Sequence, residues 1–572
     1  MATNYRPTTP HAAVKIWNFN ERLGAEGSNL SSIDNIDEVI ISTVSCTSIQ
    51  TSKSKGNPVG GFTFTLAPTR NWLSSITVGS WCAILMSDQP IDQSQLDQAS
   101  PTSLKMIGKI ESVVLDTTMM GDGTRVTQYV VSGSDWGHIF NNVCYIDNLI
   151  AQENDPKNQG NTIAAVLQNA MLSDGNTPQS FKVDDNLSTI IGIFGISSAG
   201  IQSAAQAINR VGKSVYDFLI PTDMARFCNF VDADGNINLS TKISDILTLQ
   251  TGKLAAYDDY EESNEAFGYI NPFDLQGTHT FWQILMDNSN PALNEMYNEI
   301  EWDIVAGTLR PSLTIYNRIK PFSFRDDLSR PASAINILSP FNFVKTHVVD
   351  NVRVNKVTAS TNWRDKYNFV EIRPQFSDFN VLGNLTEQKT QGFDEAAFNR
   401  EGFRPLVVGT KQFPVAPDNT KTFNFNTDYF EGWVALLKEW YFDTHKTLSG
   451  RVVIYNNDQY ISVGNNVLFE VGLVNPSLNI NSGNKSSPTT NYILGHVENV
   501  RNSFSNIDGT RTYFTEVDYV RGLVVDSSRN IVGDGTLDQM ALSLLGEYGN
   551  SKNTIGQSGS VDPDPSKLIN KV

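Results

Sequence analysis

The sequence is poor in the residues that usually build redox and metal centres. Its six histidines show no His-Glu-x-x-His or His-x-His spacing and no pairing with cysteine at ligand distance. The few cysteines stand far apart without a Cys-x-x-Cys pair, at Cys46, Cys82, Cys144 and Cys228. We interpret them as buried free thiols in a reducing compartment, with a disulfide left open as the alternative. The pattern predicts no metal site and no cofactor.

Basic residues are also under-represented. The 572 residues include 43 Lys and Arg against 61 Asp and Glu, which gives a formal net charge of −18. Tight nucleic-acid binding usually needs a basic patch, so this balance argues against it. An acidic surface would let DNA pass nearby without being held, although solubility alone also explains the charge.

No long apolar run indicates a membrane span. The N-terminus lacks the apolar core of a signal peptide. The segment Ile190–Ile208 carries no charge over nineteen residues, but it contains three glycines and several Ser and Gln residues. A span is long enough on paper, whereas this composition favours a small-residue helix packed on protein. We expect no stable membrane insertion.

Catalytic signatures are missing as well. There is no Gly-x-Ser-x-Gly elbow and no P-loop. Glu295, Glu299 and Glu301 are the candidate acids for glycoside hydrolysis, but acids at this spacing usually mark the solvated face of a helix. The sequence therefore predicts no enzyme and no catalytic, cofactor-binding or metal-binding residue.

Two acidic stretches have simple explanations. The Asp-x-Asp-Gly-Asn pattern at Asp232–Asn236 resembles part of a calcium loop but lacks the closing Glu, so a hairpin turn is favoured. The run Asp258–Glu262 is typical of a solvated loop.

Part of the chain occurs twice. Strand-like segments between Gly60 and Gly133 return in the same order between Gly450 and Gly522. The anchors are Gly79 and Gly464, Gly108 and Gly495, and Gly123 and Gly509, at offsets of 385, 387 and 386. Several matches at nearly constant offset indicate an internal duplication, and Asp-Gly at 122–123 and 508–509 predicts a hairpin turn in each copy. The two segments are predicted to fold alike.

The expected fold class is α+β and β-dominated, with two homologous tube-like β-barrel domains separated by a mixed α/β middle region. The predicted helices are 134–140, 162–172, 199–219, 280–286, 293–297, 428–446 and 537–545. The predicted domains are an N-terminal arm (1–30), a first β-barrel domain (31–148), a mixed helical and α+β middle domain (149–330), a β-rich middle domain (331–427), a helix with the second β-barrel domain (428–525), and a short helix with a flexible tail (526–572).

Two segments carry a resemblance to a known family. The first runs from Phe281-Trp282-Gln283 through Asn290-Pro291-Ala292-Leu293-Asn294-Glu295 to Pro311-Ser312-Leu313, Arg318 and Pro321-Phe322. The second runs from Trp440 through His445 and Ser449-Gly450 to Ile461-Ser462-Val463-Gly464. Over residues 35–525 the chain resembles the baseplate hub proteins of long-tailed bacteriophages, in particular contractile-tailed ones. It is similar in the same way to phage late-control proteins and to the N-terminal part of type VI secretion spike proteins.

The resemblance implies a structural virion protein located in the tail baseplate and assembled in the host cytoplasm. A homotrimer would form a pseudo-sixfold ring around the DNA exit channel, between the hexameric tail tube and a trimeric central spike. The partners would be the chain itself, the tube protein, the spike protein and other baseplate proteins, with DNA only in passage. Unlike some relatives, the chain carries no recognisable lysozyme or spike segment. The alternatives are a tail-associated cell-wall hydrolase and a glycan- or receptor-binding β-protein.

Overall fold

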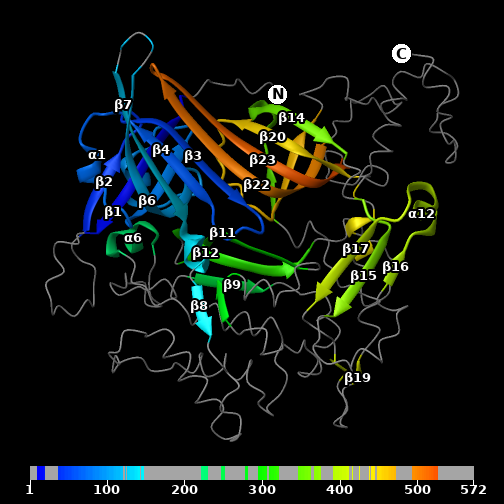
Figure 1. Ribbon diagram of the computed structural model, residues 1–572. Helices are drawn as coiled ribbons and strands as arrows, with labels where there is room; N and C mark the ends of the chain where they lie inside the picture. Colours follow the sequence, from blue (N-terminus) through cyan, green and yellow to red (C-terminus); the bar gives the residue numbers. More distant parts are fainter. Residues whose placement is uncertain are drawn as a thin grey trace, which may run out of the picture.

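Strands dominate the computed structural model. It describes residues 9–19, 36–119, 121, 123, 125–141, 143–146, 221–229, 247–251, 277–280, 282, 294–305, 308–320, 345–361, 366–374, 391–410, 415–416, 424–425, 434, 437–438, 440–442, 444, 447–471 and 492–525. Most of the described strands belong to one 13-stranded sheet, in which two units lie side by side (Figure 1). The fold class is β-dominated α+β, as expected.

Each unit contributes its own set of strands. The first unit contains β1 (His11–Phe19), β2 (Ile36–Ile41), β3 (Cys46–Ser54), β4 (Gly61–Leu66), β5 (Trp81–Ser87), β6 (Leu104–Met119) and β7 (Arg125–Asp135). The second contains β13 (Thr346–Val348), β14 (Val354–Ser360), β20 (Leu448–Tyr455), β21 (Asn466–Glu470), β22 (Tyr492–Ile507) and β23 (Thr510–Val525).

The strand order is the same in both units. The first reads β3-β4-β7-β6-β5-β1, and the second reads β14-β20-β23-β22-β21-β13. The predicted duplication is therefore confirmed for five strands of each unit, whereas the sixth differs in direction: β1 pairs antiparallel with β5, and β13 pairs parallel with β21. The two closed barrels that were expected are not present among the described strands, because β22 leaves its own unit to pair with β3 and joins both units into one open sheet.

The register also repeats. One row of paired residues crosses the first unit, and an equivalent row crosses the second. The first row is Ile49, Phe64, Val131 and Val113; the second is Val357, Val452, Val517 and Val500. These rows lie in the two main apolar cores, one for each unit. Matching apolar rows fix the register, because a slip by one residue would turn every side chain to the other face.

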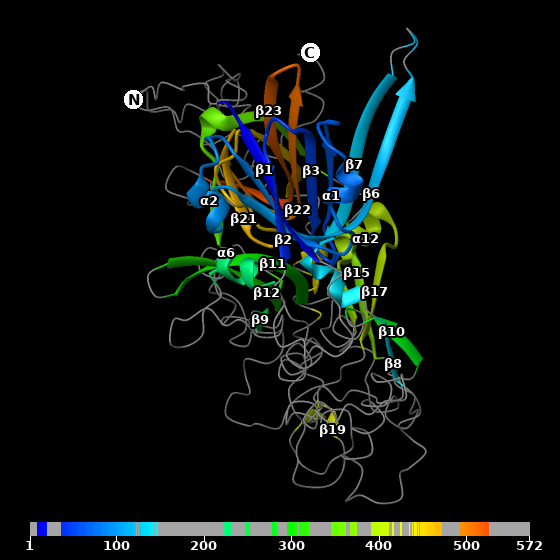
Figure 2. The same ribbon diagram turned by 90° about the vertical axis from the view of Figure 1, so that its left-hand side faces the viewer.

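A β-bulge occurs at the same place in each long hairpin. In β6 the register shifts between Ile110 and Ser112. In β22 it shifts between Val497 and Asn499, and each of these residues lies 387 positions after its counterpart in β6. A bulge bends its strand and strengthens the local twist. Its repetition shows that the curvature of the two hairpins was duplicated with their sequence. The tips of the hairpins β6–β7 and β22–β23 project to the same side of the molecule (Figures 1 and 2).

An aromatic ring covers the equivalent glycine in each unit, but it comes from a different strand. A Cβ on Gly108 would lie 2.8 Å from the ring of Phe62, which belongs to β4. A Cβ on Gly495 would lie 2.5 Å from the ring of Tyr519, which belongs to β23. Both units thus fill the same space, and glycine leaves room for the ring in each.

The structure differs from the sequence prediction at the N-terminus. Residues 1–30 were assigned to an arm, yet β1 pairs with β5 on one side and with β2 on the other. Its residues Ala12, Val14 and Ile16 are fully buried. Apolar residues at every second position explain this strand, a period that the Thr- and Pro-rich surroundings masked. The predicted domain boundaries stay a prediction.

Smaller elements complete the described part. They are β8 (Val143–Ile146) with β10 (Gly277–Thr280), β11 (Asn294–Val305) with β12 (Thr308–Ile319) and β9 (Leu247–Thr251), β15 (Phe369–Pro374) with β16 (Gln391–Phe393) and β17 (Pro405–Thr410), and β18 (Val415–Ala416) with β19 (Asn424–Phe425). The helices are α1 (Trp72–Ser75), α2 (Gln93–Asp97), α6 (Thr222–Phe227) and α12 (Glu395–Glu401), with 3₁₀ turns η2 (Trp136–Asn141) and η5 (Asn351–Arg353).

The predicted helices have mixed outcomes. The short helix expected at 134–140 is the 3₁₀ turn η2, where Asp135 accepts the backbone N–H of Gly137 at 3.0 Å. The helix expected at 428–446 is helical at its described positions 434, 437–438 and 440–441, but Gly450 lies inside β20 and not beyond a helix end. The helices predicted at 162–172, 199–219 and 537–545 lie outside the described residues. So does most of 280–286, where Thr280 ends β10 and Trp282 is helical.

Candidate assembly site

The seam between the two units is formed by two strands, β22 and β3. They pair antiparallel from Asn499 opposite Ser54 to Ser505 opposite Ser48. Asn502 is buried at this seam. Its amide donates to Thr51 Oγ1 at 3.2 Å, and its Oδ1 accepts from Thr515 at 2.8 Å. A satisfied buried amide of this kind fixes the register of the two strands.

The three candidate acids lie on β11, a strand that crosses below this seam. The helix predicted at 293–297 is wrong. Residues Asn294–Val305 pair one by one with β12 in an antiparallel hairpin. A helix of a single turn is not stable alone, so the pairing of twelve residues on a β-partner prevails over local helix propensity. Residues Glu295 to Ile300 are all buried.

Glu295 forms a buried ionic cluster with residues of both units. Its Oε2 lies 3.1 Å from Lys55 Nζ and 3.0 Å from His496 Nε2. Lys55 also pairs with Glu498. Burial opposes the charge on Lys55, but the carboxylates of Glu295 and Glu498 prevail and raise its pKa. Burial lowers the pKa of His496, whose Nδ1 contacts Asn466 Oδ1 at 3.1 Å. The cluster ties β11 to the first unit and to the second.

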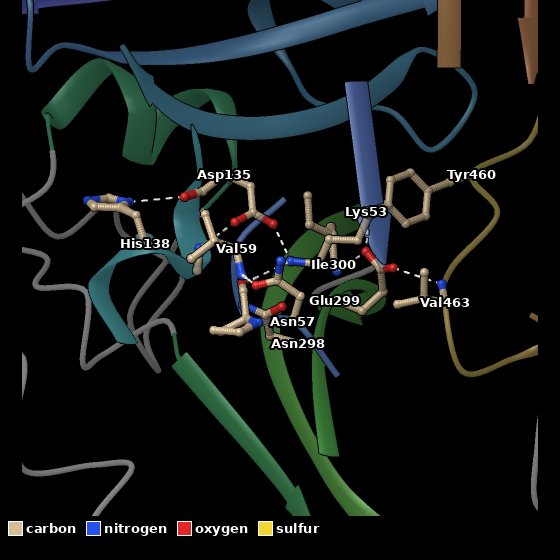
Figure 3. Close-up of polar contacts among 12 residues, drawn as sticks. Lys53, Asn57, Val59, Asp135, His138, Asn298, Glu299, Ile300, Tyr460 and Val463 are labelled. Atoms are coloured by element: carbon tan, nitrogen blue, oxygen red, sulfur yellow. Dashed lines mark hydrogen bonds and ion pairs between the residues drawn. The ribbon is translucent and has the colours of Figure 1, made fainter. Parts of the chain in front are cut away.

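Glu299 is held by hydrogen bonds on both oxygens (Figure 3). Oε1 accepts from the Ile300 backbone N–H at 3.0 Å and from the Tyr460 hydroxyl, and Oε2 accepts from the Val463 N–H at 2.9 Å. Burial raises the pKa of Glu299 to about 7, although Lys53 and these donors act in the opposite direction. Burial and the neighbouring Glu299 raise the pKa of Tyr460 well above its usual value.

A second buried ion pair stands beside Glu299. Lys53 pairs with Asp135 at the start of η2 and donates to the carbonyl of Pro58 (Figure 3). Asn298 of β11 donates to the same carbonyl at 2.7 Å. Gly137 has no room for a side chain, since its Cβ would lie 1.8 Å from Pro58 O. The loop before β4, the turn η2 and β11 are thus packed together with no space between them.

The only space beside Glu299 in the described cavities is small. It measures about 20 Å³, enough for roughly one water molecule, and is lined by Thr51, Lys53, Lys105, Met106, Glu299, Gln459, Tyr460, Ile461, Val500 and Asn502. Burial lowers the pKa of Lys105 to about 7, and its Nζ donates to Gln459 O at 3.0 Å. Such a cavity does not admit a sugar ring. Glu295 and Glu299 therefore face buried protein groups, and Glu301 is partly exposed.

Several strand edges have no partner among the described strands, those of β2 and β13 included, and two of them lie at the positions equivalent to the seam strands β22 and β3. In β6, residues 104–109 pair with β5, whereas Ser112–Met119 pair with β7 on one side alone. We call Ser112–Met119 the β6 edge. Strand β14 pairs with β20 on one side alone, and we call its other side the β14 edge. Val114, Leu115 and Met119 are exposed on the β6 edge, the last at 72%.

One face of the joined sheet is polar and continuous across both units. Directly paired residues share a face. The row that crosses this polar face is Tyr455, Phe514, Ser503, Gln50, Thr63, Ser132 and Ser112. Arg451 on this face is paired with two acids: its Nε lies 2.6 Å from Asp518 Oδ1, and its Nη1 lies 3.1 Å from Glu516 Oε2. Lys356 shares the face and forms none of the ion pairs among the described residues. Hydroxyl groups and a paired arginine are thus prominent on this polar face.

The remaining candidate features give little chemistry. In the described ranges no group of His, Cys, Asp and Glu could hold a metal ion, and no helix there is long and apolar enough to cross a membrane. The loops 232–236 and 258–262 and the uncharged segment Ile190–Ile208 lie outside those ranges. Cys46, Cys82 and Cys228 are buried free thiols, and burial raises the pKa of Cys46 to about 12.

Comparisons with known proteins identify similar structures but no sequence family. No family model matches the sequence, and no curated protein is similar to it. A tail protein from Neisseria meningitidis MC58 is 10% identical, with a TM-score of 0.40 over 90% of this chain and 96% of that chain. The 43 kDa tail protein of prophage MuSo2 from Shewanella oneidensis is 10% identical, with a TM-score of 0.37 over 89% and 98%. A chain of the phage P2 baseplate is 10% identical, with a TM-score of 0.24 over 89% of this chain and 98% of that chain.

Tail and baseplate proteins are also the class that the sequence resembles. At 10% identity no role of any residue carries over to this chain.

Proposed function

We propose that the chain is a structural protein of a phage tail baseplate, a hub in which three copies close a ring. The ring joins the hexameric tail tube to a trimeric central spike and surrounds the passage through which DNA leaves. It assembles in the host cytoplasm and remains in the virion. The observation that carries this proposal is the pair of free edges left by the duplication.

The seam within the chain supplies the template. Strand β22 reaches beyond β21 and pairs with β3 of the other unit. The equivalent of β22 is β6, and the equivalent of β3 is β14. Both equivalents have a free edge among the described strands. A sheet edge with unpaired backbone groups favours pairing with another chain. The β6 edge of one copy therefore pairs with the β14 edge of the next copy.

The register of this contact follows from the repeated rows. Phe504 is paired with Ile49 at the seam. Phe504 lies four positions after Val500, the β22 residue of the apolar row. The equivalent position in β6, four after Val113, is Thr117, and the β14 residue of the apolar row is Val357. Thr117 of one copy thus lies opposite Val357 of the next, and Leu115 lies opposite Ala359. Leu115 is 46% exposed in the single chain and becomes covered in the contact.

A contact between two different edges is head-to-tail. Such contacts form a closed ring if the rotation closes and an open filament if it does not. Because each chain carries two units, three chains present six similar units, which suits the hexameric tube that the resemblance implies. The polar face then lines the passage, where hydroxyl groups and paired charges hold no phosphate strongly.

We infer that the chain is not a wall hydrolase. Glycoside hydrolysis needs two carboxyl groups that converge on a substrate cleft. Glu295 is bound to Lys55 and His496, and Glu299 is enclosed by β11 and the loop after β20. Neither carboxyl borders a space larger than the cavity of about 20 Å³ among the described cavities.

The test is a disulfide between copies. The double variant Thr117→Cys with Val357→Cys should form, on mild oxidation, covalent species of up to three times the 63.3 kDa chain. Sedimentation under non-oxidising conditions should give the trimer for the wild type. The native Cys46, Cys82 and Cys228 are buried and should stay unreacted.

The matched control moves the register by one. Thr117→Cys with Lys356→Cys places the second thiol on the opposite face of β14 and should cross-link far less. Leu115→Asp should shift the assembly to the monomer, whereas Ile304→Asp, at the tip of the β11–β12 hairpin and more exposed than Leu115, should not. A monomer or dimer at all concentrations, or equal cross-linking in both registers, would rule out the proposed ring.

A further inference from the structure

A loop precedes β5 in the first unit and β21 in the second, and the two loops have the same backbone contacts. Gly79 N–H donates to Ile110 O at 2.7 Å, and Gly464 N–H donates to Val497 O at 2.9 Å. Both glycines have positive φ, at 90° and 75°. The two loops, Thr77–Ser80 and Ser462–Asn465, are therefore copies of one structure.

In each unit, a side chain of a neighbouring strand also accepts a hydrogen bond from the loop. Thr77 N–H donates to Asn18 Oδ1 of β1 at 3.1 Å. Ser462 N–H donates to His347 Nε2 of β13 at 3.4 Å. Burial lowers the pKa of His347 to about 3, so its ring is neutral and can accept this bond. In each unit the strand that pairs with β5 or β21, namely β1 or β13, thus supports the loop.

The two loops differ in what covers them. In the second unit β11 covers the loop: Val463 N–H donates to Glu299 at 2.9 Å, and a Cβ on Gly464 would lie 2.2 Å from the ring of Tyr297. Val463 is fully buried as a result. In the first unit the equivalent residue, Val78, is 52% exposed. Among the described strands, none lies on the loop of the first unit as β11 lies on that of the second.

The charge beside the open loop suits an acidic segment. Glu295 of β11 contacts His496 in the second unit. The residue at the same place in the first unit is Lys109, at the offset of 387 that relates Gly108 to Gly495. A Cβ on Gly79 would lie 4.0 Å from Lys109 Cε, so this side chain runs along the loop. The described residues give Lys109 no ion pair.

We propose that Val78, Gly79 and Lys109 form a docking site for an extended acidic segment of a partner protein, a segment that lies there as β11 lies on the second unit. The segment places an apolar or aromatic side chain over Val78 and Gly79 and a carboxylate on Lys109. Its pattern is that of Glu295-Met296-Tyr297-Asn298-Glu299, in which acids alternate with an aromatic residue along an extended strand.

A different protein fits the site better than a second copy. The β11 strand of any second copy is already bound to its own second unit through Glu295 and Glu299. Extended segments bind proteins through main-chain hydrogen bonds and alternate side-chain pockets, which is the arrangement found around β11. The site depends on the duplication alone and not on the closed ring, so it stands or fails separately from the proposed hub.

The test uses a peptide as the partner segment. A fluorescein-labelled peptide with the sequence of residues 294–304 is titrated with the full-length protein, and anisotropy reports binding. The wild type should bind it saturably, one peptide per chain. Lys109→Glu and Val78→Asp should each weaken binding by about tenfold or more, because the first reverses the charge and the second removes the apolar contact.

Matched controls separate this site from others. Arg125→Glu reverses an exposed charge on the distal hairpin and should leave the affinity within about twofold. A peptide with both glutamates at positions 295 and 299 replaced by lysine should not bind. Binding that survives both Lys109→Glu and Val78→Asp, or no saturable binding by the wild type, would overturn the proposal. A change in assembly mass caused by Lys109→Glu without peptide binding would assign the site to a second copy instead.

Discussion

Glu299 is the side chain at which the two units and β11 meet most closely. Its carboxyl is buried, accepts hydrogen bonds from Ile300, Tyr460 and Val463, and has a pKa raised to about 7 by burial. An acid with a raised folded-state pKa binds more protons when folded than when unfolded. Its contribution to stability is therefore full below the unfolded pKa of about 4.3 and is lost as pH rises to about 7.

The first prediction concerns this titration. Relative to Glu299→Gln, the wild type should lose about 2–3 kcal/mol of unfolding free energy between pH 5 and pH 7, because a tenfold difference in proton affinity between the folded and unfolded states corresponds to about 1.4 kcal/mol. Urea unfolding of both proteins at several pH values and constant ionic strength measures the difference.

A control carboxyl should behave otherwise. Asp92 is exposed and caps α2, and hydrogen bonds from Ser94 and Gln95 lower its pKa. It is ionised in both states between pH 5 and pH 7, so the difference between the wild type and Asp92→Asn should be flat there. Parallel curves for the wild type and Glu299→Gln would show that Glu299 does not titrate as described.

At the scale of the element, Glu295 ties β11 to both units. Glu295→Gln removes the charge that faces Lys55 and His496, and it leaves Lys55 buried with Glu498 as its remaining acid. We expect the free energy of unfolding to fall by about 2–4 kcal/mol, because removing one member of a buried ion pair leaves the other charge buried without that partner. Hydrogen exchange of the β11–β12 amides is the measurement, and it should accelerate by the corresponding factor.

Glu301→Gln is the matched variant on the same strand. Glu301 is partly exposed and forms none of the ion pairs described above. Removing its charge should therefore change the opening free energy obtained from amide exchange by less than about 0.5 kcal/mol. Equal effects of the two substitutions would mean that the ionic cluster does not anchor β11.

The elements that could be predicted from the sequence are those with a local signal. Asp-Gly turns and β-branched strands around Gly108 and Gly495 identified two equivalent hairpins, and the structure confirms their order. Strand β11 could not be recognised, because its long-range partners bury polar residues such as Glu295 and Asn298 that normally face solvent. The pairing of β22 with β3 likewise depends on chain segments more than 400 residues apart, which no local pattern encodes.

At the scale of the whole molecule, the buried acids predict an absence of activity. Purified protein incubated with peptidoglycan should release no sugar or peptide fragments above the background of a blank. Glu295→Gln and Glu299→Gln serve as comparisons, since an active site would need these carboxyls. Fragment release by the wild type that both variants lose would make the chain a hydrolase and contradict the structural role.

The polar face decides how the molecule treats DNA. Glu516 and Asp518 form ion pairs with Arg451, and Arg501 Nη1 lies 3.7 Å from Glu516 Oε2. Nonspecific affinity for DNA grows with the number of phosphates that free cations neutralise, and it falls steeply with salt. In the proposed ring, a passage lined by this face should therefore let duplex DNA slide without retaining it.

Charge reversal on this face is the last prediction. The double variant Glu516→Lys with Asp518→Lys leaves Arg451 and Arg501 unpaired beside two added lysines. It should bind duplex DNA in a filter or anisotropy assay at about 50 mM salt and lose it by about 200 mM, whereas the wild type should bind at neither. Asp37→Lys with Glu395→Lys adds the same charge at exposed sites off the polar face and should bind more weakly. If both double variants bind alike, net charge alone governs the effect and the polar face has no special relation to DNA; if the wild type itself binds with a steep salt dependence, the passage is not neutral.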